Sequence, residues 1–535
     1  MKLRYPDSIR IYTDSIKLDY KNVTNVNNDD IALKLDISED VLTVEMSAVD
    51  TPVRYVRLRW AFTENEKRHE PIKICADEWE RAYGQMEWRG ISAKRCMPWV
   101  CLVSNGSDSI SDYSERRTEC FGVKVRPDAM CFWQYDGEGI TLWLDTRSGG
   151  MGVVLKGGKI KLCEVVFGDY SGVSAFMAAK EYYRRLCDDK LSVNHKVYGN
   201  NNWYYAYGNS SDSKILADTK LLTECCRGLS NKPYMVIDSC WEQNPCDGPW
   251  DALRPTFCDM KKLADDIKEM GARPGIWFRP LSDMNHSLSL KDECRVSWAN
   301  GFLDPSHPDV LGYVSQTVRM ISHDWGYKLI KHDFSTSDIF GVWGFERSEA
   351  FARDGWHFYD RSKTSAQIVV GFYRAILDSA DKDTLILGCN VIGHLAAGLV
   401  HLNRVGDDTS GEDWERTRNY GVNALAFRLV HHGAFYESDA DCIGITEKID
   451  WKLNSEWLKL LSISGTPLFV SPKPEAITDT IISKLKNAYE RNSKQADELV
   501  PVDWMENVCP QRWRVNGEET CFHWYPDDGV QSFEP

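Results

Sequence analysis

The sequence predicts a multidomain protein with an N-terminal antiparallel β-sandwich, a central (β/α)8 TIM barrel and a short C-terminal β segment. Its 535 residues leave room for such a barrel, which takes roughly 250 residues, and for further domains. Short alternating runs broken by Asn, Asp, Gly and Ser fill the first third, and from about Tyr198 short apolar runs alternate with amphipathic helical patterns. We therefore expect a sandwich over 1–190, a barrel over 191–476, and a helix with a short β segment over 477–535.

The predicted sandwich strands alternate polar and apolar residues, as in VRYVRLRWAF at 53–62. The segment ITLWLDTRSGGMGVVLKGG at 140–158 predicts a hairpin that turns at Gly149-Gly150. The run VSAFMAAKEYYRRLCDD at 173–189 predicts a helix that leads out of this region.

Eight short runs after the sandwich predict the barrel strands. They lie at 201–208, 234–241, 273–280, 327–334, 384–391, 401–408, 433–441 and 465–472. Helical patterns separate several of them, and in the helix predicted over 260–271 the residues Leu263, Ile267 and Met270 share one face. Eight repeats over about 275 residues favour a closed barrel over an open doubly wound sheet. A helix over 480–491 and a β-like tail are then expected to pack on the barrel.

Composition and charge exclude several classes of function. Hydrophobic residues make up 43% and charged residues 27%, which is typical of a folded globular protein. The net charge of -15 repels phosphate backbones, and no dense Lys/Arg run is present, so we expect no nucleic acid partner. The sequence lacks a run of about 18 apolar residues, so we expect no membrane partner. No GxGxxG or Walker loop opens a helix, so we expect no cofactor.

The cysteines and the first residues bear on location. Seventeen cysteines are scattered without CxxC or Cys/His zinc spacing, which favours free thiols in a reducing cytosol and no metal site. The N-terminal residues lack the apolar run of about 7 to 15 residues that marks a signal peptide. We expect a cytoplasmic location, and we leave open whether the chain forms a homo-oligomer.

Polar residues that end the apolar strand runs are the candidate site residues, because active sites of barrels lie at the carboxyl ends of the strands. Each one taken singly is more often a helix cap or a solvated turn. Several carboxylates and cations would nevertheless converge on one mouth. They are Asp238, Arg279, Lys331, Asp333, Cys389, Asn390, Arg404, Asp407, Asp408, Asp439 and Asp441.

Paired carboxylates with nearby cations suit cleavage of a glycosidic bond, in which one attacks the anomeric carbon and the other protonates the leaving oxygen. Lys331 lies two residues before Asp333, so its ammonium is expected to keep that carboxylate ionised. The adjacent Asp407 and Asp408 are expected to raise the pKa of one of the two by their like charges, as an acid catalyst requires, and their spacing leaves open which of them points inward. The 20 Trp and 23 Tyr suit either a sugar-stacking cleft or a Trp-rich core.

Several motifs together resemble the retaining α-galactosidases of glycoside hydrolase families 27 and 36. They are VIDSCW, LDPSHP, IKHDF, NRVGDD, ESDADCIGI and SGTPLFVS, in the family's order over about 198–475. The segment ADEWERAYGQMEWRG and the following MPWV, within 76–100, resemble the N-terminal sandwich of bacterial members of family 36.

The resemblance implies a role for each matching residue. Asp333 of the Lys-x-Asp motif matches the nucleophile, and Asp408 of the Arg-x-x-x-Asp motif matches the acid/base, with Asp407 as the runner-up. Residues that match sugar contacts are Asp238, Lys331, Arg404, Cys389 and Asn390. Ser239 replaces a second acidic residue that often follows Asp238, and the WFRP ending leaves Arg279 without a family role. Trp203, Trp241 and Trp277 are candidates for stacking on a sugar or for core packing.

These observations predict a retaining glycoside hydrolase that cleaves terminal α-galactoside-type sugars of an oligosaccharide or glycoside substrate. Two alternatives stay open. One is a transglycosylase of the raffinose-synthase type, which differs in the acceptor that enters the site. The other is a non-catalytic carbohydrate-binding relative, which would not require both Asp333 and Asp408.

Overall fold

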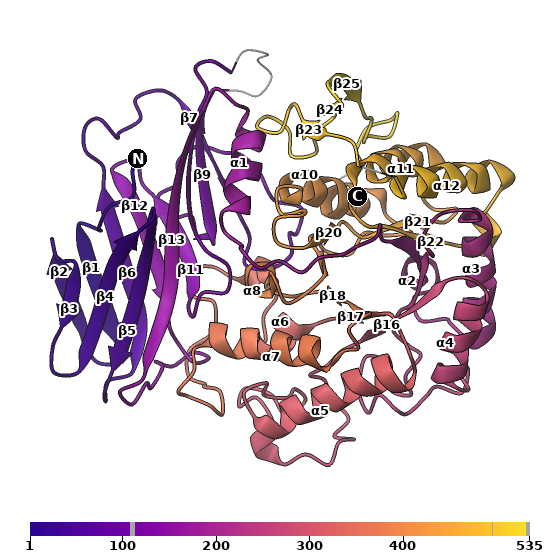
Figure 1. The fold of residues 1–535 in the computed structure, drawn as a ribbon, viewed down its shortest axis with the longest axis horizontal. Coiled ribbons are helices and arrows are strands. Elements are labelled where there is room, and N and C mark those ends of the chain that lie inside the picture. The colour runs from indigo at the N-terminus through magenta and orange to yellow at the C-terminus, as the bar shows by residue number, and fades with distance from the viewer. Residues whose placement is uncertain (107–112, 495, 531–535) are drawn as a thin grey trace.

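The computed structural model describes residues 1–106, 113–494 and 496–530. Two antiparallel sheets lie at one end of the molecule, and a parallel sheet with helices around it lies at the other (Figure 1). A small three-stranded sheet lies near the C-terminus. The prediction of a β-rich N-terminal domain followed by a TIM-like domain is thus confirmed.

The N-terminal region contains a six-stranded and a seven-stranded antiparallel sheet. The first has the spatial order β2 (Lys17–Lys21), β1 (Ser8–Thr13), β6 (Val53–Ala61), β12 (Gly139–Asp145), β11 (Met130–Tyr135) and β8 (Met97–Pro98). The second has the order β3 (Asn25–Asn27), β4 (Ile31–Ser38), β5 (Val41–Ala48), β13 (Lys159–Ser171), β10 (Arg117–Val123), β9 (Val100–Asn105) and β7 (Ile72–Ala76).

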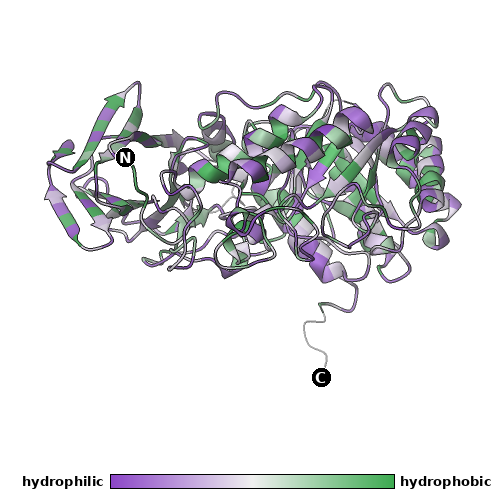
Figure 2. Cartoon of the chain, turned by 90° about the horizontal axis from the view of Figure 1, so that it is seen from below, coloured by the Kyte–Doolittle hydropathy of each residue, from purple (hydrophilic) through white to green (hydrophobic). Residues whose placement is uncertain are grey.

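The alternation of residues along these strands builds a core between the two sheets. Strand β5 buries every second side chain, because successive side chains point to opposite faces of a sheet. Figure 2 shows this alternation as green and purple bands on the N-terminal strands. Trp60 of the first sheet contacts Phe167 of the second, with ring centroids 5.5 Å apart. The alternating pattern in the sequence therefore corresponds to real inward and outward faces.

At Gly149-Gly150 the structure has the predicted turn but not the predicted hairpin. A tight turn is present, and the Ser148 N–H donates to the Met151 carbonyl at 2.8 Å. The following strand, β13, does not return along β12 but lies in the other sheet, next to β5. The two-residue turn is a local property, whereas the choice of sheet is decided by packing.

The TIM-like domain is built on one parallel sheet of nine strands. Its spatial order is β20 (Glu437–Asp439), β19 (Leu402–Arg404), β18 (Leu385–Gly388), β17 (Leu329–His332), β16 (Arg273–Phe278), β15 (Tyr234–Ile237), β14 (Tyr198–Asn201), β22 (Leu468–Pro472) and β21 (Cys442–Ile445). The strands at the two ends of this order are separated in the chain only by Ala440 and Asp441. Most of the strands are buried along their whole length, as expected where helices cover a parallel sheet.

Helices connect and cover these strands. They are α2 (Trp203–Ala206), α3 (Asp212–Cys225), α4 (Met260–Glu269), α5 (Pro308–Arg319), α6 (Ser335–Phe340), α7 (Ser365–Ser379), α8 (Gly393–Ala396), α9 (Trp414–Thr417), α10 (Ala424–Arg428), α11 (Trp451–Ser464) and α12 (Asp479–Asn492). Helix α4 buries Leu263 and Ile267 as its pattern predicts, and the Asp259 side chain caps it by accepting from the Lys262 N–H at 2.9 Å. Helix α1 (Ala175–Arg184) links the two regions.

The strand predicted at 201–208 lies three residues earlier than expected. Strand β14 ends at Asn201, whose side chain accepts from the Trp203 N–H at 2.9 Å, and the next residues form the short helix α2. Aromatic residues favoured a strand here, but the Asn side chain satisfies the backbone of a turn instead.

The C-terminal part contacts the TIM-like domain. Helix α12 lies against α11, and the strands β23 (Leu499–Pro501), β24 (Arg512–Val515) and β25 (Glu518–Cys521) form a small antiparallel sheet. Trp414 Nε1 of α9 donates to the Trp524 carbonyl at 2.7 Å. All seventeen cysteines are free thiols. Within the described residues, each helix is too short or too polar to cross a bilayer.

Candidate active site

Acidic residues follow the carboxyl ends of four strands of the parallel sheet. Asp238 follows β15, Asp333 follows β17, Asp408 lies four residues beyond the end of β19, and Asp439 ends β20. Parallel strands present their carboxyl ends at the same edge of a sheet, so these side chains gather at one mouth.

Lys331 and Asp238 form a buried ion pair in this mouth. The Lys331 ammonium lies 2.8 Å from Asp238 Oδ2, and only 9% and 4% of the two side chains are exposed. Asn201 Nδ2 donates to the same carboxylate oxygen at 2.7 Å. Burial lowers the pKa of Lys331, but the Asp238 charge, together with smaller contributions from neighbours such as Asp333, outweighs burial and raises that pKa above its usual value. The direct partner of Lys331 is therefore Asp238, and not Asp333 as expected from the sequence.

The Asp333 carboxylate accepts a hydrogen bond on each of its oxygens. Trp277 Nε1 donates to Oδ2 at 3.1 Å, and the Phe334 backbone N–H donates to Oδ1 at 2.7 Å. Phe334 has a φ of 61°, in the left-handed region that residues other than glycine rarely adopt. These two donors hold the carboxylate in one orientation at the end of β17.

Asp408 lies between two arginines. Its Oδ1 is 2.9 Å from Arg404 and 3.4 Å from Arg81, and 37% of its side chain is exposed. Burial raises the pKa of Asp408, but the charges of Arg404, Arg81 and Lys331 outweigh it and hold the pKa well below its usual range. This corrects the expectation that Asp407 raises the pKa of Asp408. Asp407 instead pairs with Arg81, at 2.6 Å.

Arg81 comes from the N-terminal region and was missed in the sequence. The loop that carries it forms a parallel bridge to the barrel, in which the Ala82 N–H donates to the Val405 carbonyl and the Asp407 N–H donates to the Ala82 carbonyl, both at 2.8 Å. The segment was assigned to the sandwich by resemblance, and Arg81 ends no barrel strand. No local pattern signals that its side chain reaches the mouth.

The segment that contains β20 and β21 adds two further carboxylates, Asp439 and Asp441. Arg404 pairs with Asp441 at 2.7 Å, and the Tyr204 hydroxyl donates to Asp441. Asp439 accepts from the Asp441 N–H at 3.0 Å, and burial, despite the opposing charge of Arg404, raises the pKa of Asp439 to about 6. Burial thus biases Asp439 toward its protonated form.

Cys389 and Asn390 lie on the floor of the mouth after β18. Arg81 Nη1 lies 3.8 Å from the Cys389 sulfur, and burial raises the pKa of the Cys389 thiol. Asn390 Nδ2 donates to Glu80 Oε1 at 3.2 Å. Both residues thus contact the N-terminal loop as well as the barrel.

The three candidate tryptophans differ in exposure. Trp241 is fully buried, with Nε1 donating to the Trp277 carbonyl at 2.9 Å, and Trp277 is 1% exposed. Of the two roles expected for Trp241, this burial favours core packing, and the ring centroids of Trp250 and Trp325 each lie 5.8 Å from that of Trp241. Trp203 is half-buried on α2.

Arg279 finds a partner in α6. It forms a bidentate pair with Asp338 at 2.6 and 2.8 Å, and its guanidinium lies 4.2 Å from the centre of the Phe334 ring. Arg279 therefore supports the loop that carries Asp333, which accounts for the residue that the family motifs left unassigned.

Aromatic residues form the rim of the mouth on the side of Arg81. The Arg81 guanidinium lies 5.6 Å from the Tyr83 ring and 5.9 Å from the Trp343 ring. Phe345, which is 61% exposed, contacts Tyr83 with ring centroids 5.0 Å apart. Tyr83 and Phe345 also line a cavity of about 410 Å³ between the N-terminal loop and the barrel.

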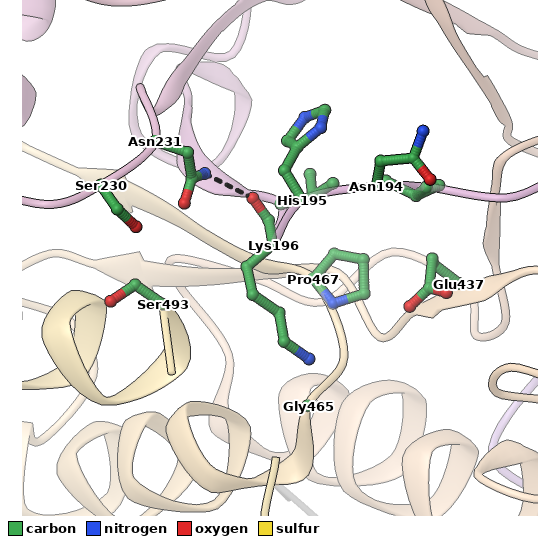
Figure 3. Close-up of a pocket in the computed structure, with 11 residues that line it drawn as sticks. Asn194, His195, Lys196, Ser230, Asn231, Glu437, Gly465, Pro467 and Ser493 are labelled. Carbon is green, nitrogen blue, oxygen red and sulfur yellow. Dashed lines mark hydrogen bonds between the residues drawn. The ribbon is translucent and has the colours of Figure 1, made fainter. Parts of the chain in front are cut away.

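A second cavity, of about 440 Å³, lies at the opposite end of the TIM-like domain, and Figure 3 shows the residues that line it. Its lining includes His195 and Lys196, just before β14, and Glu437 at the start of β20. These are the amino ends of the strands, away from the carboxylate cluster. In the described part of the chain, the side chains that gather closely enough for a metal ion are Cys294, His307 and Asp309.

Comparisons with solved structures find the same fold. An α-galactosidase from Thermus thermophilus, in complex with p-nitrophenyl α-D-galactopyranoside, matches with a TM-score of 0.59 and 16% identity over 93% of this chain and 99% of that one. A family 36 α-galactosidase from Geobacillus stearothermophilus matches with a TM-score of 0.58 and 14% identity over 91% and 73% of the two chains. An α-galactosidase from Lactobacillus brevis matches with a TM-score of 0.56 and 12% identity, over 98% of this chain and 74% of that one.

No family model matches the sequence. At these identities the similarity is one of fold, and it confirms at that level the resemblance to family 36 that the motifs indicated.

Proposed function

We propose that the chain is a retaining glycoside hydrolase that cleaves terminal α-galactosides, with Asp333 as nucleophile and Asp408 as acid/base. The observation that carries this proposal is the set of groups gathered at the mouth: the oriented Asp333 carboxylate, the buried Lys331–Asp238 pair and the Arg404–Asp408 pair. The similar folds belong to α-galactosidases, one of them holding stachyose, and this supports the same substrate class.

In the first step, an oxygen of Asp333 bonds to the anomeric carbon while the bond to the glycosidic oxygen breaks and Asp408 gives that oxygen a proton. In the second step, water bonds to the anomeric carbon, Asp333 leaves, and Asp408 takes a proton from the water. The net reaction consumes one water and releases the sugar with its anomeric configuration retained.

Binding of the glycoside lets Asp408 take up from solvent the proton that the acid needs. In the free site the arginines keep Asp408 ionised. A sugar that covers the exposed part of the Asp408 side chain removes water from the carboxylate, and desolvation favours the protonated form. Asp238 and Lys331 offer an acceptor and a donor for sugar hydroxyls, since they form an ion pair at the mouth.

We also propose the domain limits 1–190, 191–476 and 477–535, and a closed (β/α)8 barrel in which Glu437–Ile445 acts as one seventh strand. Strand β20 pairs with β19 and β21 pairs with β22, so this single segment would join the two ends of the sheet.

The transglycosylase alternative shares these residues and differs only in the acceptor. A non-catalytic carbohydrate-binding protein would not need Asp333 and Asp408 together in one mouth. Product analysis with and without an added sugar acceptor separates the first two, and turnover of any glycoside excludes the third.

The test is a screen of nitrophenyl glycosides followed by replacement of the nucleophile. We expect cleavage of the α-galactoside, loss of turnover in Asp333→Ala, and rescue by azide with inverted configuration, because the small anion enters the space that the carboxylate vacates. Asp383→Ala, at an exposed loop on the other side of β18, is the control and keeps full activity. Retained turnover in Asp333→Ala, or no cleavage of any glycoside, would contradict the proposal.

A further inference from the structure

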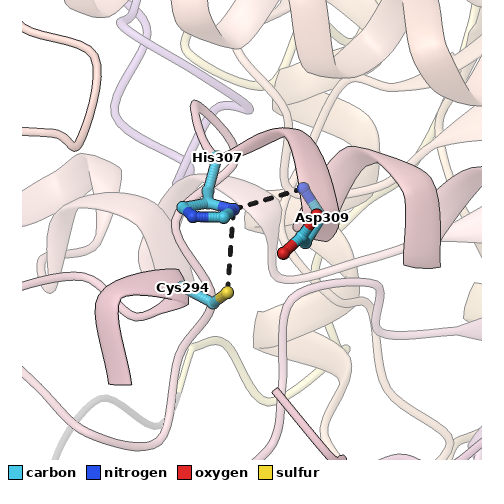
Figure 4. Close-up of side chains that lie close together, drawn as sticks. All are labelled: Cys294, His307 and Asp309. Atoms are coloured by element: carbon cyan, nitrogen blue, oxygen red, sulfur yellow. Dashed lines mark hydrogen bonds between the residues drawn. The ribbon is translucent and has the colours of Figure 1, made fainter. Parts of the chain in front are cut away.

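Three side chains with metal-binding groups meet at the start of α5, outside the network described above. Cys294 ends a short 3-10 turn at Asp292–Cys294, His307 precedes the first residue of α5, and Asp309 lies in its first turn. Their donor atoms all lie within 4.8 Å of one another (Figure 4). Thiolate, imidazole and carboxylate are the three ligand types that zinc takes in proteins.

The spacing of sulfur and nitrogen fits an ion between them. Cys294 Sγ and His307 Nδ1 are 3.6 Å apart. A tetrahedral zinc ion about 2.3 Å from sulfur and about 2.05 Å from nitrogen holds these two atoms about 3.6 Å apart. The Cys294 sulfur and the His307 nitrogen therefore already lie at the separation that a bound zinc ion requires.

The backbone holds this pair in place. The Asp304 N–H donates to the Cys294 carbonyl at 2.8 Å, and the His307 N–H donates to the Asp304 carbonyl at 3.0 Å. Cys294 is fully buried and His307 is 5% exposed. Asp309 is exposed, so the third ligand faces the solvent from which an ion arrives.

We propose that Cys294, His307 and Asp309 bind a divalent cation of the zinc class, with water in the fourth position. Binding replaces the thiol proton of Cys294, which goes to solvent, by the metal ion. The Asp309 N–H donates a hydrogen bond to His307 Nδ1 at 3.2 Å, and this bond is lost when Nδ1 binds the metal ion. This amide belongs to the first turn of a helix, where no intrahelical acceptor exists, and water can take its hydrogen bond.

The ion would join two segments of the long connection between β16 and β17, which also carries Arg279 at its start. Neither the residues nor the chemistry overlaps with the proposed hydrolase site. Metal binding by these three residues does not depend on whether the chain cleaves glycosides.

Cobalt(II) titration of the full-length, metal-free protein tests the site, because cobalt bound to a thiolate gives a strong charge-transfer absorption. We expect one equivalent of Co²⁺ to produce this absorption and Zn²⁺, which binds such sites more tightly, to abolish it. Cys294→Ser should lose the absorption, whereas Cys258→Ser, which removes an exposed cysteine elsewhere, should keep it.

Asp309→Asn provides a second test at an exposed position. It should keep the cobalt–thiolate absorption but require more Co²⁺ to reach it, because one anionic ligand is lost. No thiolate absorption in the parent protein, or the same absorption in Cys294→Ser, would overturn the proposal.

Discussion

Asp408 is ionised in the free site, although the role that we propose for it begins with the donation of a proton to the leaving oxygen. A general acid matters most when the leaving group is poor, since a nitrophenolate departs without protonation and a sugar alcohol does not. Replacement of Asp408 should therefore cost more activity on a substrate with a poor leaving group than on one with a good leaving group.

We predict that Asp408→Ala loses far more activity on an α-galactosyl oligosaccharide than on a nitrophenyl α-galactoside, by about 10²-fold or more. On the aryl substrate the glycosyl-enzyme should accumulate, because water lacks its base, and intact-protein mass spectrometry detects it. Asp407→Ala should weaken both substrates by similar factors. Equal losses for Asp408→Ala, with substrate dependence in Asp407→Ala or Asp439→Ala, would move the acid/base role to that residue.

Arg81 provides a prediction about pH. It lies 3.4 Å from Asp408 and helps to hold the pKa of that carboxylate low. In Arg81→Met the pKa of Asp408 rises, so the protonated acid persists to higher pH and the alkaline limb of kcat/KM should move upward. A pH profile of kcat/KM, which reports groups of the free enzyme, measures this shift. Arg184→Met, at an exposed position on α1, should leave the limb unchanged, and a downward shift in Arg81→Met would refute the argument.

At the scale of elements, the loop after β19 has little freedom. It carries Asp407 and Asp408, bridges to Ala82, and passes the Tyr420 carbonyl so closely that a Cβ at Gly406 would lie 2.0 Å from that oxygen. A methyl group here must push the backbone aside, and the carboxylates move with it.

We predict that Gly406→Ala lowers both the melting temperature and kcat/KM on the α-galactoside. Gly371→Ala is the matched control, since its Cβ meets open space on an exposed face of α7 and should stabilise the helix by up to about 1 kcal/mol. Unchanged activity in Gly406→Ala would show that this loop adapts, and that its close contact does not position Asp408.

At the scale of the whole molecule, one buried cluster joins the sandwich side to the barrel. Asp77, directly after β7, lies 2.7 Å from Arg428 of α10 and 3.4 Å from His431. Burial raises the pKa of Asp77, but Arg428 and His431 outweigh it and lower that pKa to about 2. The pair therefore contributes stability that is present above the unfolded pKa of about 4 and is lost as the pH falls toward 2.

We predict that Asp77→Asn destabilises the protein at pH 7 by about 3 to 5 kcal/mol, because Arg428 is left buried without a counter-charge. The difference from the parent protein should shrink as the pH falls from about 4 to about 2. Denaturant unfolding at several pH values measures both effects. Asp527→Asn, which removes an exposed partner of Lys452, should change stability by less than about 0.5 kcal/mol, and an equal effect of the two variants would contradict the prediction.

The sequence by itself determined the class of each region and the place of the carboxylates. Alternation along β5 and the apolar stripe of α4 follow from backbone geometry over a few residues, so both were visible in the sequence. Asp238 and Asp333 were also visible, because Asp238 directly follows the apolar run YMVI and Asp333 lies three residues beyond Ile330, at the end of the strand pattern YKLIKH. Their roles came from the family motifs around them and remain predictions.

Only the tertiary structure decided which side chains meet. Arg81 and Asp408 are separated by 327 positions, and their contact depends on how the sandwich loop seats on the barrel. The same applies to the choice of Asp238 as the partner of Lys331 and to the burial of Trp241. Local periodicity specifies helices and strands because it acts over a few bonds, whereas partners in a site are selected by the packing of whole elements, which no short segment encodes.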